Sequence, residues 1–434
     1  MNISKIQYIN GNFNFLYEMI ESAQIALTIR KRGGRSTMPL INNCYGYGKS
    51  GSTPQLCDQV DNFKASAGEL SAKLTWSAPT KDEDNSFVGA RIVRKVGSAP
   101  KNKSDGTVVY EGTELTYTDT GLTEGTTYYY RAFAYNEKKK YQTALCVASI
   151  KAVRISTTLN DNPWNVIRSI SDLGQGENYW AIGDCKEIVL NGAIGEGLTL
   201  SNYNVCVFIL GFNHNAELEG ENRIHFQIGK TALTNGVDVC LVDKSYANYY
   251  FYENDTRFDS SAHVLFSMNS SESDSYGWEQ SQMRTSVIGT SLSSYSGTFI
   301  GTLPTELRTV LKSVTKYTDN AQKSNGSESD VTATTDYAFL LSPFEINGST
   351  KATDSGNHVN DHEAKYQRQY AYYLAGNSYI KYRYNSTGSR VSYWLRSPSA
   401  VNSGFFYVDA SSTPTIREGY SSNYALGIAP AFCV

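Results

Sequence analysis

The chain has 434 residues, of which 39 are Lys or Arg and 42 are Asp or Glu, giving a formal net charge of -3 and a pI near 6.0. This balance excludes the strongly basic character expected of a general nucleic-acid-binding protein. The sequence also lacks an apolar run of about 18 residues, the length a membrane-spanning helix needs. The length leaves room for two or three domains with substantial cores.

The Tyr and Cys content of the chain further narrows the class of protein to which it can belong. Aromatic residues make up 12% of the chain, and 32 of them are Tyr, an excess that fits either a binding surface or an all-β protein with many half-buried strands. The seven Cys are scattered and form no Cys-x-x-Cys pair, which predicts reduced, buried thiols in a protein made in a bacterial cytoplasm. The first 35 residues show no secretory signal, so export would depend on lysis or on a particle.

Residues 1–58 are predicted to form an N-terminal attachment segment and linker. An apolar stretch over residues 15–27 favours a helix that packs on a partner, and a cluster of four Arg and Lys residues follows over residues 30–35. The cluster has no interleaved aromatic residues, so a solvated turn is favoured over nucleic-acid binding. Gly46, Gly48, Gly51 and Pro54 are typical of a linker.

Residues 59–156 show the alternation of apolar and polar residues that is typical of short β-strands. Over residues 70–76, Leu70, Ala72, Leu74 and Trp76 share one face, and Ser, Lys and Thr occupy the other. Further strands are predicted over residues 88–96, 108–110, 116–119 and 128–135, separated by turn residues. Strands at this spacing over about a hundred residues indicate a β-sandwich.

This segment resembles a fibronectin type III domain. The resemblance depends on Trp76 with Pro79, and on a motif running from Leu122 through Gly125 and Tyr128 to Ala134. The six-residue spacing from Leu122 to Tyr128 matches the tyrosine corner of that family, which implies a structural hydrogen bond from the Tyr128 phenol. The resemblance implies a spacer or a weak carbohydrate contact rather than an enzyme.

Residues 157–434 show few helix signals and several short strands. An amphipathic helix is predicted from Trp164, and a second over residues 303–314 with Pro304 in its first turn. Tyr366, Tyr370 and Tyr373 recur at helical spacing, which favours core packing over a cofactor site. Strands are predicted at residues 187–190, 205–210, 223–228, 336–341 and 392–395, and long polar loops at residues 267–276 and 318–335.

The C-terminal residues hold the most informative pattern. Two apolar anchors, residues 393–398 (Tyr-Trp-Leu-Arg-Ser-Pro) and residues 427–434 (Gly-Ile-Ala-Pro-Ala-Phe-Cys-Val), bracket a tract at residues 399–424. The tract mixes aromatic rings with Ser, Asn, Asp and Thr, as antibody paratopes do. We predict the ligand-contacting residues to be Phe405, Tyr407, Asp409, Ser411, Thr413, Tyr420, Asn423 and Tyr424. We predict the scaffold residues to be Trp394, Leu395, Arg396, Pro430 and Phe432.

These two anchors resemble a C-terminal domain of unknown function in phages and prophages of gut bacteria. That domain is similar to the C-type-lectin-like variable proteins of diversity-generating retroelements, in which such a tract is rewritten to change ligand binding. The resemblance covers residues from about Trp164 to the C-terminus and implies an α+β lectin-like scaffold with a displayed recognition surface. The predicted fold class is therefore an all-β fibronectin III-like sandwich followed by an α+β C-type-lectin-like domain.

The sequence shows no complete motif of a catalytic or metal site. His358 and His362 have the i, i+4 spacing of two zinc ligands but lack the Glu of a metalloprotease helix. Residues 192–197 have the wrong glycine order for a dinucleotide loop, which favours a turn. No Gly-x-Ser-x-Gly elbow or Ser or Cys triad is apparent. The signatures of calcium-dependent lectins are also absent, so we predict no cofactor, no metal and no enzyme.

The sequence thus predicts a receptor-binding adhesin of a phage or prophage tail, carried on the virion. Its expected partners are a host-surface protein or glycan, bound by the C-terminal domain, and other tail proteins, bound by the N-terminal segment. The same interpretation is compatible with a homo-oligomer of this chain. Nucleic acid and a membrane span are not expected. Two alternatives stay open: a carbohydrate-active enzyme with paired carboxylates in a cleft, and a structural virion decoration protein whose aromatic residues are all buried.

Overall fold

The structure is a computed structural model. It describes residues 8–9, 12–13, 56–81, 86–243, 266–271, 277–320, 328–348, 362–384, 386–399, 404–411 and 415–434. The chain divides into two compact units, Met1–Thr53 and Pro54–Val434. In the first unit, β1 (Tyr8–Ile9) pairs with β2 (Asn12–Phe13). The predicted helix at residues 15–27 and the glycine linker lie outside the described residues.

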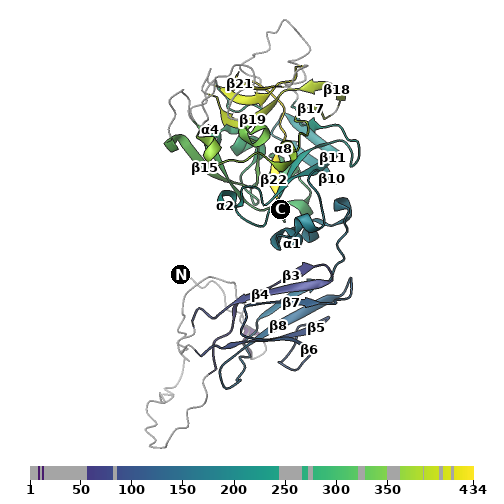
Figure 1. Cartoon of the computed structure of the whole chain (residues 1–434), viewed down its shortest axis with the longest axis vertical. Coiled ribbons are helices and arrows are strands. Elements are labelled where there is room, and N and C mark those ends of the chain that lie inside the picture. The colour runs from purple at the N-terminus through teal and green to yellow at the C-terminus, as the bar shows by residue number, and fades with distance from the viewer. Residues whose placement is uncertain are drawn as a thin grey trace, which may run out of the picture. The chain divides into compact units, whose positions relative to one another are not determined.

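A seven-stranded sandwich follows, with three strands in one sheet and four in the other (Figure 1). The first sheet has the order β3-β4-β7 and the second β6-β5-β8-β9, all antiparallel. The strands are β3 (Asp61–Gly68), β4 (Ser71–Ser77), β5 (Gly89–Val96), β6 (Thr107–Gly112), β7 (Thr116–Thr120), β8 (Thr127–Tyr135) and β9 (Val147–Lys151). The five predicted strands are confirmed, and β3 and β9 are additional.

The sandwich core contains three of the four residues that the alternation placed on one face, whereas Leu70 is half-buried in the turn before β4. Ala72, Leu74 and Trp76 of β4 are buried, and so are Tyr128 and Tyr130 of β8. The backbone N–H of Thr123 donates to the phenol oxygen of Tyr128 at 3.0 Å, which is the bond expected of a tyrosine corner. The Tyr130 hydroxyl donates to Asp119 at 2.9 Å, so this buried ring also has a polar partner.

The C-terminal domain has a separate hydrophobic core, built on a five-stranded sheet of order β10-β11-β12-β22-β16. Its strands are β10 (Cys185–Ile194), β11 (Leu198–Phe212), β12 (Ile224–Lys230), β22 (Ala431–Cys433) and β16 (Ala338–Phe339). The last residues of the chain therefore form an inner strand, between β12 and β16. Residues 195–197 connect β10 to β11, which confirms the turn predicted there.

Three smaller sheets complete the domain. They are β13 (Val239–Cys240) with β17 (Lys381–Arg383) and β18 (Ser386–Val391), β14 (Val314–Asp319) with β15 (Val331–Asp336), and β19 (Tyr393–Pro398) with β20 (Gly404–Val408) and β21 (Ile416–Ser421). The predicted strands at residues 187–190, 205–210, 223–228 and 392–395 are confirmed. The predicted strand at residues 336–341 is split between the end of β15 and β16.

The helices of this domain are short. They are α1 (Trp164–Asp172), α2 (Ala216–Glu219), α4 (Gly277–Gln280), α5 (Phe299–Thr302), α6 (Thr305–Arg308), α7 (Pro343–Asn347) and α8 (Ala371–Leu374). Single turns of other helix types are η1 (Leu159–Asp161), η2 (Gly176–Asn178), η3 (Met283–Ile288), η4 (Glu328–Asp330) and η5 (Glu363–Lys365). The predicted helix at Trp164 is confirmed as α1, which buries Val166, Ile167 and Ile170. Among the described residues no helix is long and apolar enough to cross a membrane.

Two predictions from the pattern are corrected. The helix expected over residues 303–314 is only the single turn of α6, because the backbone N–H of Lys312 donates to the carbonyl of Cys433 and Val314 begins β14. The polar stretch at residues 318–335, expected to be a loop, contributes its two ends to β14 and β15, which pair with each other. Long-range strand pairing thus overrides the local pattern at both places.

Candidate ligand-binding site

The first strand of the predicted ligand-contacting tract, β20, is buried. β19 pairs with β20, which pairs with β21, and Trp394 lies opposite Tyr407 in this register. Phe405 is fully buried and Tyr407 is 8% exposed. Consecutive residues of a strand point to opposite faces, so the burial of Phe405, Phe406 and Tyr407 means that both faces of β20 are covered. Phe405 and Tyr407, predicted as surface contacts, are therefore corrected to core residues.

The polar residues that follow β20 and β21 lie nearer the surface. Asp409, Ser411, Asn423 and Tyr424 are half-buried. Thr413 lies outside the described residues, and only the backbone of Tyr420 is described, within β21. The structure adds two half-buried cations that the sequence analysis did not identify, Arg390 and Arg417. We call these six described residues the polar rim: Arg390, Asp409, Ser411, Arg417, Asn423 and Tyr424.

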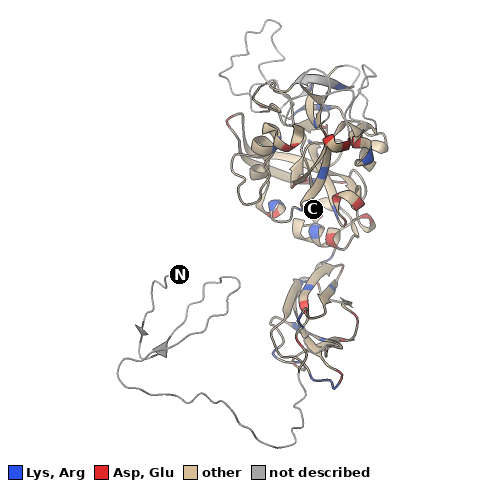
Figure 2. Ribbon diagram, turned by 90° about the vertical axis from the view of Figure 1, so that its left-hand side faces the viewer, with Lys and Arg blue, Asp and Glu red and all other residues tan. Residues whose placement is uncertain are grey.

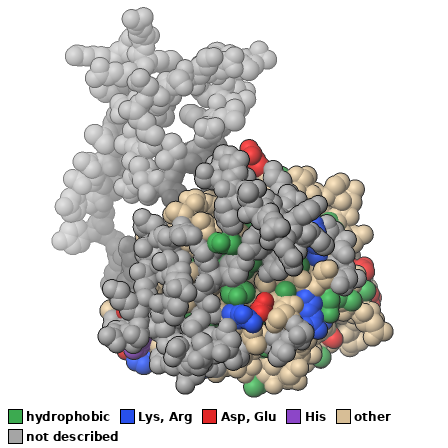
Figure 3. Space-filling model, turned by 90° about the horizontal axis from the view of Figure 1, so that it is seen from above, with side chains coloured by type: hydrophobic (Ala, Val, Ile, Leu, Met, Phe, Trp, Pro, Cys, Tyr) green, Lys and Arg blue, Asp and Glu red, His purple; other side chains and the backbone are tan. Residues whose placement is uncertain are grey.

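Polar contacts hold the rim to the strands beneath it. Arg390 donates from Nη1 to the carbonyl of Ser411 at 2.8 Å, and Nε of Arg417 lies 2.9 Å from Oδ2 of Asp409. The backbone N–H of Asp409 donates to the carbonyl of Thr415 at 2.9 Å. Figure 3 views the end of the domain at which β18 and β21 lie in Figure 1, and hydrophobic, basic and acidic side chains are exposed there. Guanidinium, carboxylate, amide and phenol groups are all suited to hydrogen-bonding a polar ligand.

The five predicted scaffold residues are all buried. Trp394 donates from Nε1 to the carbonyl of Phe266 at 2.8 Å. Phe432 stacks on Phe226 with ring centroids 5.6 Å apart, and the carbonyl of Pro430 accepts from the N–H of Ile228 at 3.0 Å. Leu395 and Arg396 have no exposed surface. These positions are consistent with the predicted supporting role.

Arg396 belongs to a charged cluster enclosed in the core. We call Lys316, Glu219, Glu345, Arg396 and Glu363 the charged cluster; no side chain among them is more than 2% exposed. Nζ of Lys316 lies 2.7 Å from Oε2 of Glu219 and 2.7 Å from Oε1 of Glu345. Arg396 donates to Glu345 and, at 3.0 Å, to the carbonyl of Leu340. The cluster contains three carboxylates and two cations, which come from positions 219 to 396 of the sequence.

Aromatic and imidazole rings surround this cluster. Tyr370 places its hydroxyl 2.9 Å from Nζ of Lys316 and 3.0 Å from Nδ1 of His225, and its ring stacks on His214 at 3.7 Å. Burial lowers the pKa of His214 to about 3, so its imidazole is neutral. Cys433 Sγ lies 3.3 Å from Nδ1 of His225, but burial raises the pKa of this thiol to about 12. The Cys433 thiol is therefore protonated and enclosed, unlike the thiolate of a catalytic Cys–His pair.

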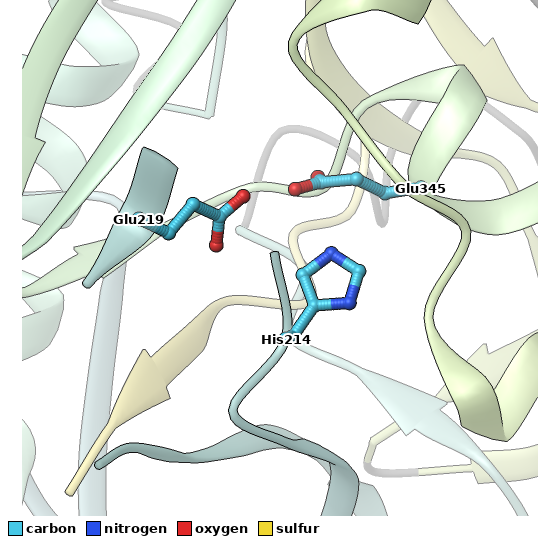
Figure 4. Close-up of side chains that lie close together, drawn as sticks. All are labelled: His214, Glu219 and Glu345. Atoms are coloured by element: carbon cyan, nitrogen blue, oxygen red, sulfur yellow. The ribbon is translucent and has the colours of Figure 1, made fainter. Parts of the chain in front are cut away.

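His214, Glu219 and Glu345 also have the composition of a metal site. One ligand atom from each lies within 4.8 Å of the others, and Figure 4 shows the two carboxylates directed toward one another beside the imidazole. The ammonium of Lys316 contacts both carboxylates, so the protein supplies its own cation there. We therefore interpret these three residues as part of the charged cluster. Of the predicted histidine pair, His358 lies outside the described residues.

The charged cluster makes stability depend on pH. Burial raises the pKa of Glu363 to about 7, and the nearby Arg396 only partly offsets this. A carboxyl whose pKa is raised on folding stabilises the protein fully below its unfolded pKa of 4.5, and this contribution is lost as the pH rises through about 7. We expect the free energy of unfolding of the wild-type protein, taken relative to that of a Glu363→Gln variant, to fall by up to about 3 kcal/mol between pH 5 and pH 8.

The measurement is denaturant unfolding of the full chain at several pH values. Glu363→Gln keeps the size of the side chain but does not titrate, so the difference between wild type and variant isolates this carboxyl from the buried His214 and from Glu219. A difference in the free energy of unfolding that stays constant or rises from pH 5 to pH 8 would contradict the prediction.

A polar groove borders β10 in the described part of the C-terminal domain. It has a volume of about 580 Å³ and lies between β10 and the α5–α6 segment. The exposed Glu187 and Glu306 line it together with the amides of Asn191 and Asn204. Arg308 also lines it, but its guanidinium is held by the carbonyls of Gly301 and Leu303. The groove thus offers carboxylates and amides to a polar ligand.

Comparisons with known proteins match the two parts of the chain separately. Residues 250–434 match the family model described as a domain of unknown function (DUF6273). No curated protein matches the chain.

Solved structures of fibronectin type III domains are similar to the sandwich. One is the domain of human fibronectin type III domain containing protein 3, with 20% identity over 25% of this chain and 94% of that chain, and a TM-score of 0.19. Another is an Fn3-like protein from Clostridium thermocellum, with 22% identity over 23% and 97% of the two chains, and a TM-score of 0.18. A third is FN3tt, with 18% identity over 23% of this chain and 99% of that chain, and a TM-score of 0.19. The sandwich is fibronectin type III-like, as its strand order and tyrosine corner indicate.

Proposed function

We propose that the protein is a non-enzymatic ligand-display protein that binds through the polar rim of its C-terminal domain. The observation that carries this proposal is the division of residues 399–424 between buried aromatic strands and a half-buried polar rim. The covered strand β20, paired on both sides with β19 and β21, gives a firm base, and binding residues are commonly found on segments that such a scaffold positions. The acidic and basic side chains of the described residues are interspersed (Figure 2), which fits a polar ligand better than a polyanion.

The finer fold proposal is a C-type-lectin-like domain. Its support is the pair of C-terminal motifs, together with the antiparallel sheets, the few short helices and the inner position of the C-terminal strand β22. The same motifs support the proposal that residues 399–424 are diversified by a retroelement. In that case substitutions would fall on the rim, whereas the buried Phe405 and Tyr407 would tolerate few changes.

The proposed setting is a phage or prophage tail, with the protein on the virion surface. The ligand is then a host-surface protein or glycan, and residues 1–58 attach the chain to other tail proteins. The fibronectin type III-like sandwich serves as a spacer. Several copies on one particle, or a homo-oligomer, convert modest affinity at each rim into firm attachment, because each further contact forms at high effective concentration.

Binding of the full chain to gut bacterial cells and to their extracted surface glycans tests the proposal. We expect saturable binding, and a decrease in affinity of at least about tenfold for Asn423→Ala and Tyr424→Ser, since a few central contacts carry most of the binding energy. Asn165→Ala is the matched control, because Asn165 is an exposed amide on α1, away from the tract. Equal binding by the rim variants would exclude the rim, and the absence of saturable binding to every preparation would contradict ligand display.

The groove on β10 favours a second candidate, a carbohydrate-active enzyme. Glu187 and Glu306 are two carboxylates on one groove, which is the minimum that glycoside hydrolysis needs. The same glycan samples, monitored for released oligosaccharide, distinguish the two functions. Product that disappears in Glu187→Gln or Glu306→Gln would favour the enzyme, and binding without product favours display.

A further inference from the structure

We propose that Lys316 and Glu219 form an intramolecular amide bond that ties β14 to α2. The bond would join Nζ of Lys316 to Cδ of Glu219 and release one water molecule. It is independent of the proposed ligand binding, because it lies in the core and needs no partner. The inference starts from the direct contact of the two groups, 2.7 Å between Nζ and Oε2, at a place where neither side chain is exposed.

Proximity and enclosure favour this condensation. A contact of this length places the amine within reach of the carboxyl carbon, and a fixed near-attack geometry removes most of the entropic cost of joining two groups. The side chain of Lys316 lies over the rings of Phe339, at 4.3 Å, and Tyr370, at 5.2 Å. Amide formation in water is opposed by the solvent, whereas an enclosed site that expels the released water favours the neutral amide over the buried ion pair.

Each neighbouring group has a definite role in the reaction. Oε1 of Glu345 lies 2.7 Å from the same Nζ and can accept a proton from it. Asn215 donates from Nδ2 to Oε1 of Glu219 at 3.3 Å, where negative charge develops when the amine adds to the carboxyl carbon. The Tyr370 hydroxyl, 2.9 Å from Nζ, orients the amine.

The two carboxyls are not equivalent, which indicates Glu219 as the electrophile. Burial raises the pKa of Glu219, which favours its protonated and more reactive form. Burial also acts to raise the pKa of Glu345, but Arg396 and Lys316 outweigh it and hold that pKa at about 2. Glu345 is further held by the capping box of α7, in which its Oε2 accepts from the N–H of Ser342 at 2.8 Å. It therefore stays ionised, and it can accept the proton that the nitrogen loses after adding to the carboxyl carbon, when that nitrogen is far more acidic than an ammonium.

The step balances without a further reactant. Starting from the ammonium–carboxylate pair, one proton passes directly from Nζ to Oε2 of Glu219, which gives a neutral amine and a carboxylic acid. After the amine adds to Cδ, Glu345 accepts the second proton from the nitrogen and passes it to the departing hydroxyl of Glu219. The nitrogen electron pair forms the bond from Nζ to Cδ, and the bond from Cδ to that oxygen breaks with its electrons on the oxygen. The products are one amide and one water, and no oxidant, metal or nucleotide is consumed.

Mass spectrometry of the intact, denatured full chain tests the proposal. We expect a mass about 18 Da below that of the sequence, the mass of one water, and a branched peptide joining Lys316 to Glu219 after proteolysis. A full sequence mass in mature protein would overturn the proposal, and this result needs no variant.

Two variants locate the bond and its base. Lys316→Arg keeps a cation but removes the nucleophilic amine, so it should show the full mass; persistence of the deficit would place the loss of water elsewhere and overturn the assignment. Glu345→Gln keeps the shape of the base without its proton affinity, so the cross-linked fraction at a fixed time after folding should fall at least about tenfold. An unchanged cross-linked fraction in Glu345→Gln would overturn the role assigned to Glu345.

Discussion

Arg396→Met is expected to destabilise the C-terminal domain by about 3–5 kcal/mol, because it removes one partner of a buried ion pair and leaves the other charged. The guanidinium contacts Glu345 and donates to the carbonyls of Leu340 and Tyr317 and to Oγ1 of Thr318. Removing it takes the Arg396 charge from Glu345 and deprives Glu363 of its cation, 3.9 Å away. The methionine fills much of the volume but satisfies none of these acceptors.

Denaturant unfolding followed by tryptophan fluorescence measures this loss. Four of the five Trp are in the C-terminal domain, since Trp76 is the one within the sandwich, so the signal reports mainly on the domain that contains the cluster. Arg417→Met is the matched control. Its ion pair with Asp409 is partly exposed, with 41% of the Arg417 side chain accessible, so its loss should cost less than about 1 kcal/mol. Equal effects of the two substitutions would contradict the structural role assigned to the charged cluster.

Phe405→Ala is expected to cost about 3–5 kcal/mol of unfolding free energy, the range for removing a buried phenyl ring and leaving a cavity. Phe405 is fully buried in β20, between β19 and β21, and its pairing partners are Pro398 and Tyr420. Any loss of ligand binding by this variant would then follow from damage to the base of the rim.

Thermal and denaturant unfolding of Phe405→Ala and Phe405→Leu separate the two interpretations of this ring. The leucine variant retains most of the apolar volume and should cost less than about 1.5 kcal/mol. If Phe405→Ala unfolded like the wild-type protein but lost binding to bacterial cells, the ring would be a contact residue, as the sequence pattern suggested.

The local pattern of the sequence was sufficient for much of the fold. The alternation in β4, the tyrosine corner at Tyr128 and the amphipathic α1 each depend on residues within about ten positions of one another, and each is present in the structure. The C-terminal motifs likewise marked Trp394 and Phe432 as anchors, and both are buried. The sequence pattern and the structure agree here because the periodicity of apolar residues and the face that they bury are both set within a single helix or strand.

The tertiary structure alone decided which aromatic residues reach the surface and which charges meet. Alternation along β20 cannot show that both of its faces are covered, so Phe405 and Tyr407 looked like surface contacts. Glu219, Lys316 and Arg396 lie in unrelated parts of the sequence, and only the packing of α2, β14 and β19 brings them into one enclosed cluster. The reason is physical: periodicity is a property of neighbouring residues, whereas the burial and pairing of a charge depend on segments that lie 29 to 97 residues away in the sequence.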